Sequence, residues 1–449
     1  MNSFDTICAL ATSLGESAIN IIRISGKDAI SIASSVLSGV NLYKKDTGTI
    51  SYAHVVDNGE VLDEVLVSLF RAPKSYTKED VVEINTHGGS YVTERVLELL
   101  LEKGARMAEA GEFTKRAFLN GRIDLSKAEA VMDMIEAQTK NSLALANRGL
   151  KGDVYKEINA LRSDILDILL HIEVNIDYPE YTDEIQVSKD LCINKSKELI
   201  NKIENIIASA ENKRVYKEGI KTVILGKPNV GKSSLLNALL NEDKAIVTSF
   251  RGTTRDTIEA KLNMGGIILH LIDTAGVRDT EDPVEKIGIS KTMKALDEAE
   301  LVLLVLDHET GIEDEDKELL ELSKNKKRII IANKSDVSND LIPNIKYIDI
   351  SALKRDGLDE LEKAIHSYFI NDSKLLNIDT AISSSRHIAL LKNANKSLNN
   401  TLTGAINSDF LDMISIDLKD AYDLLGLITG ETSSESLVDE LFKKFCLGK

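Results

Sequence analysis

The sequence predicts a multidomain protein of mixed α/β and α+β class, in which an α/β domain is inserted into a discontinuous helical domain that follows a small α+β domain. Three observations lead to this prediction. The 449 residues exceed what one ordinary core accommodates. Short apolar runs alternate with amphipathic segments in residues 218–375, which is typical of a sheet covered by helices. Long helical patterns lie on both sides, in residues 119–217 and 376–449.

Residues 1–118 are expected to form the α+β domain. Runs rich in β-branched residues occupy positions 19–24, 65–70 and 81–84, and turns that contain glycine separate them. This spacing indicates strands mixed with short helices.

The helical domain is expected to begin near residue 125. Ser126 and Glu129 form a capping-box pattern, which predicts that a helix starts there. Helical spacing of apolar residues then continues to about residue 213, with a break at 177–180. A further helical stretch includes residues 411–427. Because the two helical stretches flank one complete α/β unit, we predict that they pack together as one domain.

In the α/β domain, the apolar runs at 223–225, 267–272, 301–306 and 328–332 indicate strands that are buried on both faces, as in a parallel sheet.

Composition narrows the class of protein. The net charge of −17 argues against a chain that grips a nucleic acid backbone by itself, so an RNA substrate would need a partner to hold much of it. Three widely spaced cysteines form neither a disulfide framework nor a metal site, and Cys8 and Cys192 are expected to be buried as small apolar residues. With no long apolar run and no signal-peptide pattern, we expect a cytoplasmic protein without a membrane span.

A phosphate-binding motif stands at Gly226-Lys-Pro-Asn-Val-Gly-Lys-Ser233. It reads G-x-x-x-x-G-K-S between an apolar run and a helical stretch, which is the context that this motif requires. Lys232 is expected to reach the β- and γ-phosphates, and the Ser233 hydroxyl to bind Mg²⁺. The residues expected to contact the nucleotide here are Asn229, Val230, Gly231, Lys232, Ser233 and Ser234.

Two later segments complete the phosphate side. The Asp273 carboxylate, at the end of an apolar run, can hold Mg²⁺ through water, and the Gly276 N–H can meet the γ-phosphate. The loop before it supplies Thr254 as a further Mg²⁺ ligand. The residues predicted to contact the nucleotide in these segments are Thr248, Ser249, Phe250, Arg251, Gly252, Thr253, Thr254, Asp273, Thr274, Ala275 and Gly276.

Two other segments predict selection of guanine. Asn333, Lys334 and Asp336 follow an apolar run, and the aspartate can accept from the two adjacent N–H groups of guanine, which adenine lacks. Ser351 and Ala352 follow the next strand-like segment and can place a backbone N–H near guanine O6. Together the motifs predict an enzyme that hydrolyses GTP.

The position after Gly276 is occupied by Val277, where a glutamine could have oriented the attacking water. Hydrolysis must therefore use another group. Carboxylates in residues 278–285 are candidates for positioning or activating this water.

Beyond these motifs, the chain resembles the bacterial and organellar tRNA modification GTPase family MnmE, also called TrmE, over nearly its full length. The resemblance is carried by the terminal segment Phe445-Cys-Leu-Gly-Lys449, by Val284-Glu-Lys-Ile-Gly288, and by Gly111-Glu-Phe-Thr-Lys-Arg-Ala-Phe-Leu-Asn120. The segments Ile22-Arg-Ile-Ser-Gly26 and His87-Gly-Gly89 match as well. Ser17 departs from it, because the family often has a glycine at this position.

The resemblance implies the roles of several residues. It implies that K⁺ replaces an arginine finger, with Asn229, Thr248, Phe250 and Thr253 as ligands, and that Glu285 is the catalytic residue, which acts through water. It also implies that the N-terminal domain binds a 5-formyl- or 5,10-methylene-tetrahydrofolate. The residues implied for the folate pocket are Arg23, Glu83, Arg122 and Lys449.

The resemblance further implies a homodimer that forms a heterotetramer or larger complex with an FAD-binding subunit of the MnmG family. Such a complex would convert C5 of the wobble uridine of certain tRNAs to an aminomethyl or carboxymethylaminomethyl derivative, with glycine or ammonium as nitrogen donor. Two alternatives are a ribosome-assembly or regulatory GTPase, which would act by binding alone, and a folate-binding scaffold whose α/β domain has lost turnover.

Overall fold

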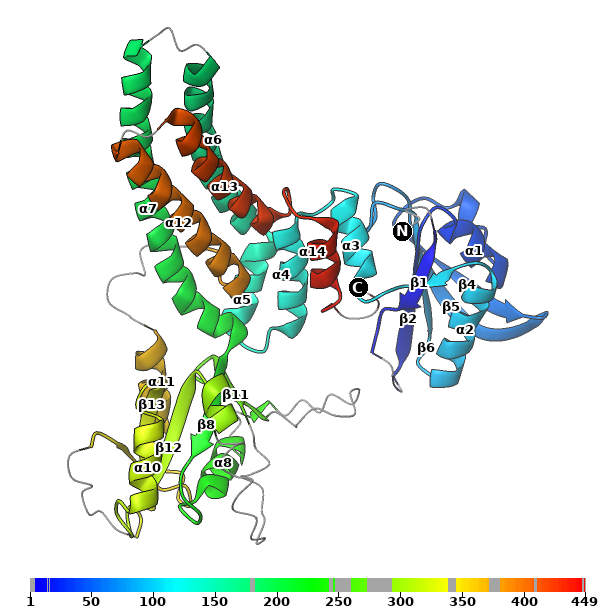
Figure 1. The fold of residues 1–449 in the computed structure, drawn as a ribbon. Helices are drawn as coiled ribbons and strands as arrows, with labels where there is room; N and C mark the ends of the chain where they lie inside the picture. The colour runs from blue at the N-terminus through cyan, green and yellow to red at the C-terminus, as the bar shows by residue number, and fades with distance from the viewer. Residues whose placement is uncertain are drawn as a thin grey trace. The chain divides into compact units, whose positions relative to one another are not determined.

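The computed structural model describes the chain except for residues 1–4, 14, 16, 178–181, 242–244, 247–259, 273–292, 338–344, 371–379, 408–409, 446–447 and 449. The chain divides into two compact units. Unit 1 comprises Met1–Met132 together with Asp423–Lys449, and unit 2 comprises Asp133–Tyr422. Unit 1 therefore joins two segments that are far apart in the sequence (Figure 1). The domain boundaries expected from the sequence stay predictions.

Unit 1 contains a seven-stranded sheet in the order β3-β4-β5-β6-β2-β1-β7. All neighbouring strands are antiparallel except β1 and β7, which are parallel. The strands are β1 (Ile7–Leu10), β2 (Ile19–Ser25), β3 (Leu37–Ser38), β4 (Thr49–Asp57), β5 (Glu60–Phe70), β6 (Val81–His87) and β7 (Arg106–Met107). The three strands predicted from the sequence correspond to β2, β5 and β6, which confirms the α+β class.

The helices of unit 1 pack on this sheet or join it to the C-terminal segment. Helices α1 and α2 contact β1, β2 and β6, where Ile22 and Ile24 alternate into a buried core. Helix α14 contacts α3 through Phe442, which is buried together with Leu125 and Phe445. The helical elements are α1 (Ala29–Val36), η1 (Leu42–Lys44), α2 (Ser90–Glu102), α3 (Glu112–Leu119) and α14 (Glu435–Phe442).

A helix does begin at residue 125, but the predicted capping residue was wrong. Helix α4 spans Leu125–Glu136, so Ser126 lies inside its first turn. The Asp124 carboxylate accepts the Lys127 N–H at 3.0 Å and also accepts the Ser126 hydroxyl. Asp124 caps the helix because it stands at the position from which a side-chain oxygen reaches the third N–H of the first turn.

Unit 2 contains the predicted α/β sheet, in the order β14-β13-β12-β8-β11-β10-β9. The strands are β8 (Ile220–Leu225), β9 (Ala245–Ile246), β10 (Ala260–Met264), β11 (Ile267–Leu271), β12 (Leu301–Asp307), β13 (Lys327–Asn333) and β14 (Ile348–Ile350). The five strands from β14 to β11 are parallel, but β10 and β9 add an antiparallel edge. The sheet is therefore mixed and not parallel throughout, because β10 and β11 form a hairpin.

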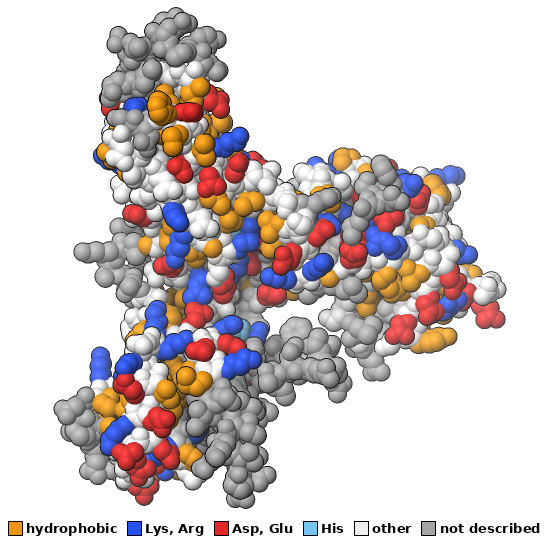
Figure 2. Space-filling model, in the orientation of Figure 1, with side chains coloured by type: hydrophobic (Ala, Val, Ile, Leu, Met, Phe, Trp, Pro, Cys, Tyr) orange, Lys and Arg blue, Asp and Glu red, His pale blue; other side chains and the backbone are white. Residues whose placement is uncertain are grey.

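Helices cover both faces of the unit 2 sheet, as the fully apolar strands predicted. On one face, Leu303 and Val305 of β12 pack with apolar residues of α8 (Lys232–Asn241) and α11 (Leu358–Phe369). On the other, Val302 and Leu304 pack against α10 (Asp314–Leu322). The first turn of α10 is acidic, which suits the positive end of a helix dipole, and acidic side chains gather around this helix in Figure 2.

The rest of unit 2 is helical, with α5 (Lys140–Leu150), α6 (Asp153–Asp177), α7 (Thr182–Glu218) and α12 (Ser385–Ile406). Helix α13 (Leu411–Thr429) spans the division between the units. Apolar residues that recur at helical spacing along α6 are buried, including Ile158, Ile165 and Ile172. Helices α7 and α12 pack along each other (Figure 1). At the end of α7 only Gly219 separates Glu218 from β8, so the longest described helix leads directly into the strand before the phosphate loop.

Cys8 and Cys192 are buried and free, as predicted. Burial raises the pKa of the Cys8 thiol to about 12 and also raises the pKa of Cys192, so neither is a ready nucleophile. Within the described part of the chain, no helix has the length and apolar character needed to cross a membrane.

Candidate functional site

The predicted phosphate loop connects β8 to α8, and two glycines fix its path. Gly226 has a φ of 156°, and a Cβ there would lie 2.4 Å from the Val305 carbonyl oxygen of β12. Gly231 has a φ of 91°, and a Cβ there would lie 2.2 Å from the Asn333 side-chain nitrogen. Any larger residue would push the loop away from these neighbours. Between the glycines, Asn229 also adopts a positive φ, of 63°.

Lys232 stands at the start of α8 and folds back over its own loop. Its Nζ donates to the carbonyl oxygens of Gly226 and Lys227, each at 2.7 Å. Burial lowers the pKa of this lysine. Ser233 and Ser234 follow on the exposed surface of the first turn of α8. A loop that presents a lysine and a helix N-terminus together can bind phosphate oxygens.

Asn333 joins three of the predicted motifs. It ends β13 and is only 3% exposed. Its side-chain Nδ2 donates to the Val230 carbonyl oxygen of the phosphate loop at 2.8 Å, and its Oδ1 accepts the Ala352 N–H at 3.1 Å. The segments after β8, β13 and β14 therefore meet at one end of the sheet.

Asp336 and Lys334, which also follow β13, are each held by a hydrogen bond from or to a side chain of another segment. Asp336 Oδ1 accepts the Ser351 hydroxyl at 2.6 Å, and this hydrogen bond holds the pKa of Asp336 below its usual range. Lys334 has a φ of 67° and its Nζ donates to Asp307 Oδ2 at 2.6 Å. Asp336 thus keeps a charged carboxylate beside Ser351, as recognition of paired N–H donors requires.

The remaining predicted residues of the nucleotide site lie outside the described residues. They are Thr248, Ser249, Phe250, Arg251, Gly252, Thr253, Thr254, Asp273, Thr274, Ala275, Gly276 and Glu285.

In unit 1, three of the residues predicted for a folate lie together around Tyr76. Arg23 of β2 is directly opposite Glu83 of β6, and the Arg23 Nε donates to Glu83 Oε1 at 2.8 Å. The Arg23 guanidinium lies 5.6 Å from the centroid of the Tyr76 ring, and that of Arg122 lies 4.8 Å from the same centroid. Two cations, one carboxylate and an aromatic face suit a ligand with both aromatic and anionic parts.

The C-terminal segment also contacts Arg23. Arg23 Nη1 donates to the Gly448 carbonyl oxygen at 3.4 Å. Gly448 has a φ of 88°, and a Cβ there would lie 2.1 Å from the Leu10 carbonyl oxygen of β1. Phe445 packs on Phe442, with ring centroids 4.8 Å apart. The neighbouring Cys446 and Lys449 lie outside the described residues.

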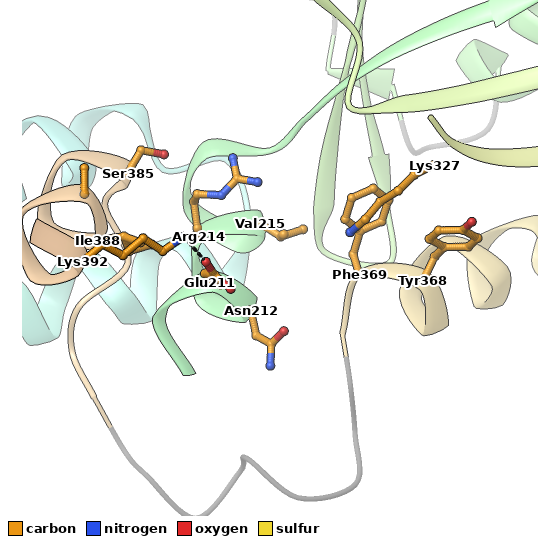
Figure 3. Close-up of a pocket in the computed structure, with 11 residues that line it drawn as sticks. Glu211, Asn212, Arg214, Val215, Lys327, Tyr368, Phe369, Ser385, Ile388 and Lys392 are labelled. Carbon is orange, nitrogen blue, oxygen red and sulfur yellow. Dashed lines mark hydrogen bonds and ion pairs between the residues drawn. The ribbon is translucent and has the colours of Figure 1, made fainter. Parts of the chain in front are cut away.

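A hollow of about 550 Å³ elsewhere in unit 2 contains none of the predicted site residues (Figure 3). It lies among α7, β13, α11 and α12, where Glu211 pairs with Lys392 at 2.6 Å and Lys327 Nζ lies 4.3 Å from the Phe369 ring centroid. Its volume alone does not make it the nucleotide site.

Three residues near the predicted sites were not predicted from the sequence. Tyr76 lies in a turn-rich loop where no periodic pattern singles it out. Asp307 ends β12 and is visible only as a polar residue after an apolar run, which could have marked it. Lys227 occupies one of the variable positions of the phosphate-loop motif, so the motif itself assigns it no role.

Comparisons with known proteins find family models and relatives that this chain resembles. The family model of the MnmE helical domain matches residues 125–446, and that of the GTP-binding protein TrmE N-terminus matches residues 6–122. The G domain of the T. maritima FeoB iron transporter is similar in structure, with a TM-score of 0.25, 28% identity, and coverage of 33% of this chain and 98% of its own.

Two curated relatives match almost from end to end. The tRNA modification GTPase MnmE of Streptococcus thermophilus is 49% identical over 451 residues, which cover 99% of each chain. That of Ligilactobacillus salivarius is 48% identical over 456 residues, which cover 99% of this chain and 98% of the relative. The family predicted from the motifs is confirmed, and the chain belongs to the MnmE family of tRNA modification GTPases.

Proposed function

We propose that this chain binds and hydrolyses GTP at the end of the unit 2 sheet where Asn333 meets the phosphate loop. The hydrogen bonds of Asn333 to Val230 and Ala352 carry the proposal, because they bring the phosphate-binding and guanine-selecting segments into one site. Asp336 accepts from the base, and Lys232 leaves its loop carbonyls to bind the β- and γ-phosphates.

Two metal ions fit the donor atoms of this proposal. The hydroxyls of Ser233 and Thr254, with Asp273 through water, are the hard oxygen donors that Mg²⁺ prefers. The side-chain oxygen of Asn229 and oxygens of Thr248, Phe250 and Thr253 would hold K⁺. When bound, the two cations neutralise charge that develops on the phosphates. In the chain itself, Glu285 positions the attacking water, a role that Val277 cannot perform.

The ion requirement is tested by measuring GTP hydrolysis in K⁺ and in Na⁺. We expect turnover in K⁺, much slower turnover in Na⁺, and loss of the difference in Asn229→Ala. Equal rates in the two salts would reject the K⁺ site. Glu285→Ala should retain nucleotide binding and lose hydrolysis. Turnover in that variant would remove Glu285 from the mechanism.

We place the folate one-carbon donor in unit 1, against Tyr76. The guanidinium groups of Arg23 and Arg122 and the ammonium of Lys449 would pair with the folate carboxylates, and Glu83 would accept from the pterin N–H edge. The cation–π distances at Tyr76 support a pocket that also takes an aromatic ring. Arg122→Met should weaken binding of 5-formyltetrahydrofolate in calorimetry, and unchanged binding would reject this pocket.

The proposed product is a wobble uridine substituted at C5, made in the cytoplasm with an FAD-binding subunit of the MnmG family. The net charge of −17 supports a division of labour in which that partner supplies the basic surface for tRNA. Nucleoside analysis of tRNA from a deletion strain should show loss of the aminomethyl-type wobble uridines. An unchanged profile would favour a ribosome-assembly or regulatory role, in which the GTPase acts by binding alone.

The proposed homodimer has a suitable surface on unit 1. Ile50 and Tyr52 of β4 and Leu66 of β5 share one face of the sheet and are 67%, 54% and 46% exposed. Tyr52 and Leu66 are directly opposite in the ladder, so the apolar surface is continuous, as in self-association sites. Leu66→Glu should convert a dimer to a monomer in sedimentation, and an unchanged dimer would place the interface elsewhere.

A further inference from the structure

Lys227, the second residue of the phosphate loop, has a side chain that is buried in the protein. Its side chain is held by an acceptor cage that consists of Thr310, Glu313 and Asp316. The Nζ lies 2.8 Å from Thr310 Oγ1, 2.7 Å from Glu313 Oε2 and 3.2 Å from Asp316 Oδ2. The residue is only 8% exposed. All three ammonium hydrogens of Lys227 can therefore be satisfied within the cage.

Asp316 places a buried negative charge in the cage, next to the ammonium group of Lys227. It lies in the first turn of α10 and is fully buried, at 0% exposure. Its Oδ2 also accepts the Glu313 N–H at 3.1 Å, whereas its Oδ1 has no hydrogen-bond partner among the described residues. A buried carboxylate needs a counter-charge. Burial works to lower the pKa of Lys227, but the bonds to Glu313 and Asp316 outweigh it and raise this pKa, so the lysine keeps its charge.

The backbone of Lys227 forms part of the phosphate-binding apparatus. Its carbonyl oxygen and that of Gly226 are the two acceptors of Lys232 Nζ, both at 2.7 Å. On one side the loop touches β12, because Gly226 leaves no room for a Cβ beside Val305. On the other side the Lys227 side chain ties it to α10. The peptide that holds Lys232 is thus fixed from two directions.

We propose that Lys227 is a positioning residue that holds the phosphate loop, and through it Lys232, in the geometry that binds the β- and γ-phosphates. The inference rests on the proposed GTP hydrolysis and adds a residue to it. The described contacts of the Lys227 side chain are with Thr310, Glu313 and Asp316, and none of these is a base-selecting residue. Its loss therefore affects phosphate binding and turnover and leaves the preference for guanine unchanged.

A simpler role would be to neutralise Asp316 and so to stabilise the fold. The double variant Lys227→Met/Asp316→Asn separates the two roles in the full-length chain. It removes both buried charges together, and the introduced asparagine side chain can still accept the Glu313 N–H. Lys227→Met alone leaves Asp316 buried without its counter-charge, so its thermal unfolding should occur at lower temperature than that of the double variant.

The readouts are the unfolding temperature, the affinity for fluorescent GDP and GTP analogues, and kcat and KM for GTP. We expect the double variant to recover the unfolding temperature but to keep nucleotide affinity and kcat/KM about tenfold or more below wild type, because a loop displaced by about 1 Å loses that much. Lys227→Arg should restore binding. ATP should remain a poor competitor in every variant.

Lys317→Met is the matched control, because Lys317 lies on the same helix and pairs only with exposed Asp314 among the contacts described. It should match wild type. Glu313→Gln weakens the cage from its exposed side without leaving a buried charge, and it should lower GTP affinity by several-fold at an unchanged unfolding temperature.

The positioning role would be overturned if the folded double variant had wild-type affinity and turnover. If the double variant does not fold, the same result in Glu313→Gln would overturn it. A wild-type chain that neither binds nor hydrolyses GTP would instead overturn the proposed function.

Discussion

The Ser351 hydroxyl donates to the carboxylate of Asp336 at 2.6 Å, although β14 lies between the two residues in the sequence. This bond holds one carboxylate oxygen of Asp336 and leaves the other for the proposed contact with the base. Asp336→Asn should exchange an acceptor for a donor. We expect GTP affinity to fall by about 100-fold and affinity for xanthosine triphosphate, whose C2 carbonyl accepts from an amide, to rise.

Competition between GTP and xanthosine triphosphate measures this change. Asp359→Asn on α11 serves as an exposed control and should keep the preference for GTP. A variant at Asp336 that still prefers GTP would show that the base is recognised elsewhere.

Asn333→Ala tests the bridge between the motifs. It removes both side-chain hydrogen bonds and leaves the Val230 carbonyl and the Ala352 N–H without that partner. Each unsatisfied buried group costs about 1–3 kcal/mol. We therefore expect nucleotide affinity to fall by more than about tenfold and the unfolding temperature of the full chain to fall as well, measured by titration and calorimetry. An effect on stability alone would mean that the bridge does not shape the nucleotide site.

Acid should weaken unit 1 through Glu112, which is 5% exposed. Burial works to raise the pKa of Glu112, but hydrogen bonds from Arg106, the Glu109 N–H and Arg116 outweigh it and hold this pKa below its usual range. The charged form therefore stabilises the fold above the unfolded pKa of about 4.3, and the contribution is lost as the pH falls through the folded pKa.

The unfolding temperature of wild type should consequently fall more steeply between about pH 5 and pH 3 than that of Glu112→Gln, which lacks the titrating group. Glu98→Gln, at an exposed position of α2, is the control and should follow the wild-type slope. Parallel slopes for wild type and Glu112→Gln would contradict the assignment.

Gly448→Ala tests the contact of the C-terminal segment with β1. The new Cβ would lie 2.1 Å from the Leu10 carbonyl oxygen, so the segment must move away from Arg23. Strain of about 1–3 kcal/mol corresponds to a loss of folate affinity of roughly 5- to 150-fold. Gly59 has a similar positive φ, of 90°, but a Cβ there would meet nothing within 4 Å, so Gly59→Ala carries the backbone strain without the collision. It should keep wild-type folate binding, and GTP hydrolysis should persist in both variants.

Sequence patterns predicted those features that depend on local spacing. All seven residues of β12 are buried, so its apolar run identified a central strand. Strand β10 was not predicted because only Leu262 and Met264 of its five residues are buried and no continuous apolar run marks it, as suits a strand near an edge. The cap of α4 was misplaced by two residues because Asp124 and Ser126 are both good capping residues, and only the helix geometry decides between them.

Of the candidate nucleotide and folate sites, too, only the parts that depend on local spacing could be predicted from the sequence. The spacing of Lys232, Asn333 and Asp336 relative to the strands predicted segments that do meet at one end of the sheet. The acceptors of Lys227 and the position of Tyr76 between two arginines depend on packing between elements far apart in the chain. No local pattern encodes such contacts, because they arise only when the sheet has assembled.

The joining of Met1–Met132 with Asp423–Lys449 in unit 1 also has a consequence for synthesis. A ribosome makes β1 and its neighbours first, but Gly448 emerges only after the whole of unit 2 has been translated. Unit 2 is continuous in the sequence, so all of its residues are made before the last residues of unit 1. The hydrogen bond between Arg23 and Gly448 can form only later, so a prematurely terminated chain would contain the residues of the proposed nucleotide site but lack the segment that contacts Arg23. Translation thus supplies all residues of the proposed nucleotide site before the contact of Arg23 with the C-terminal segment can form.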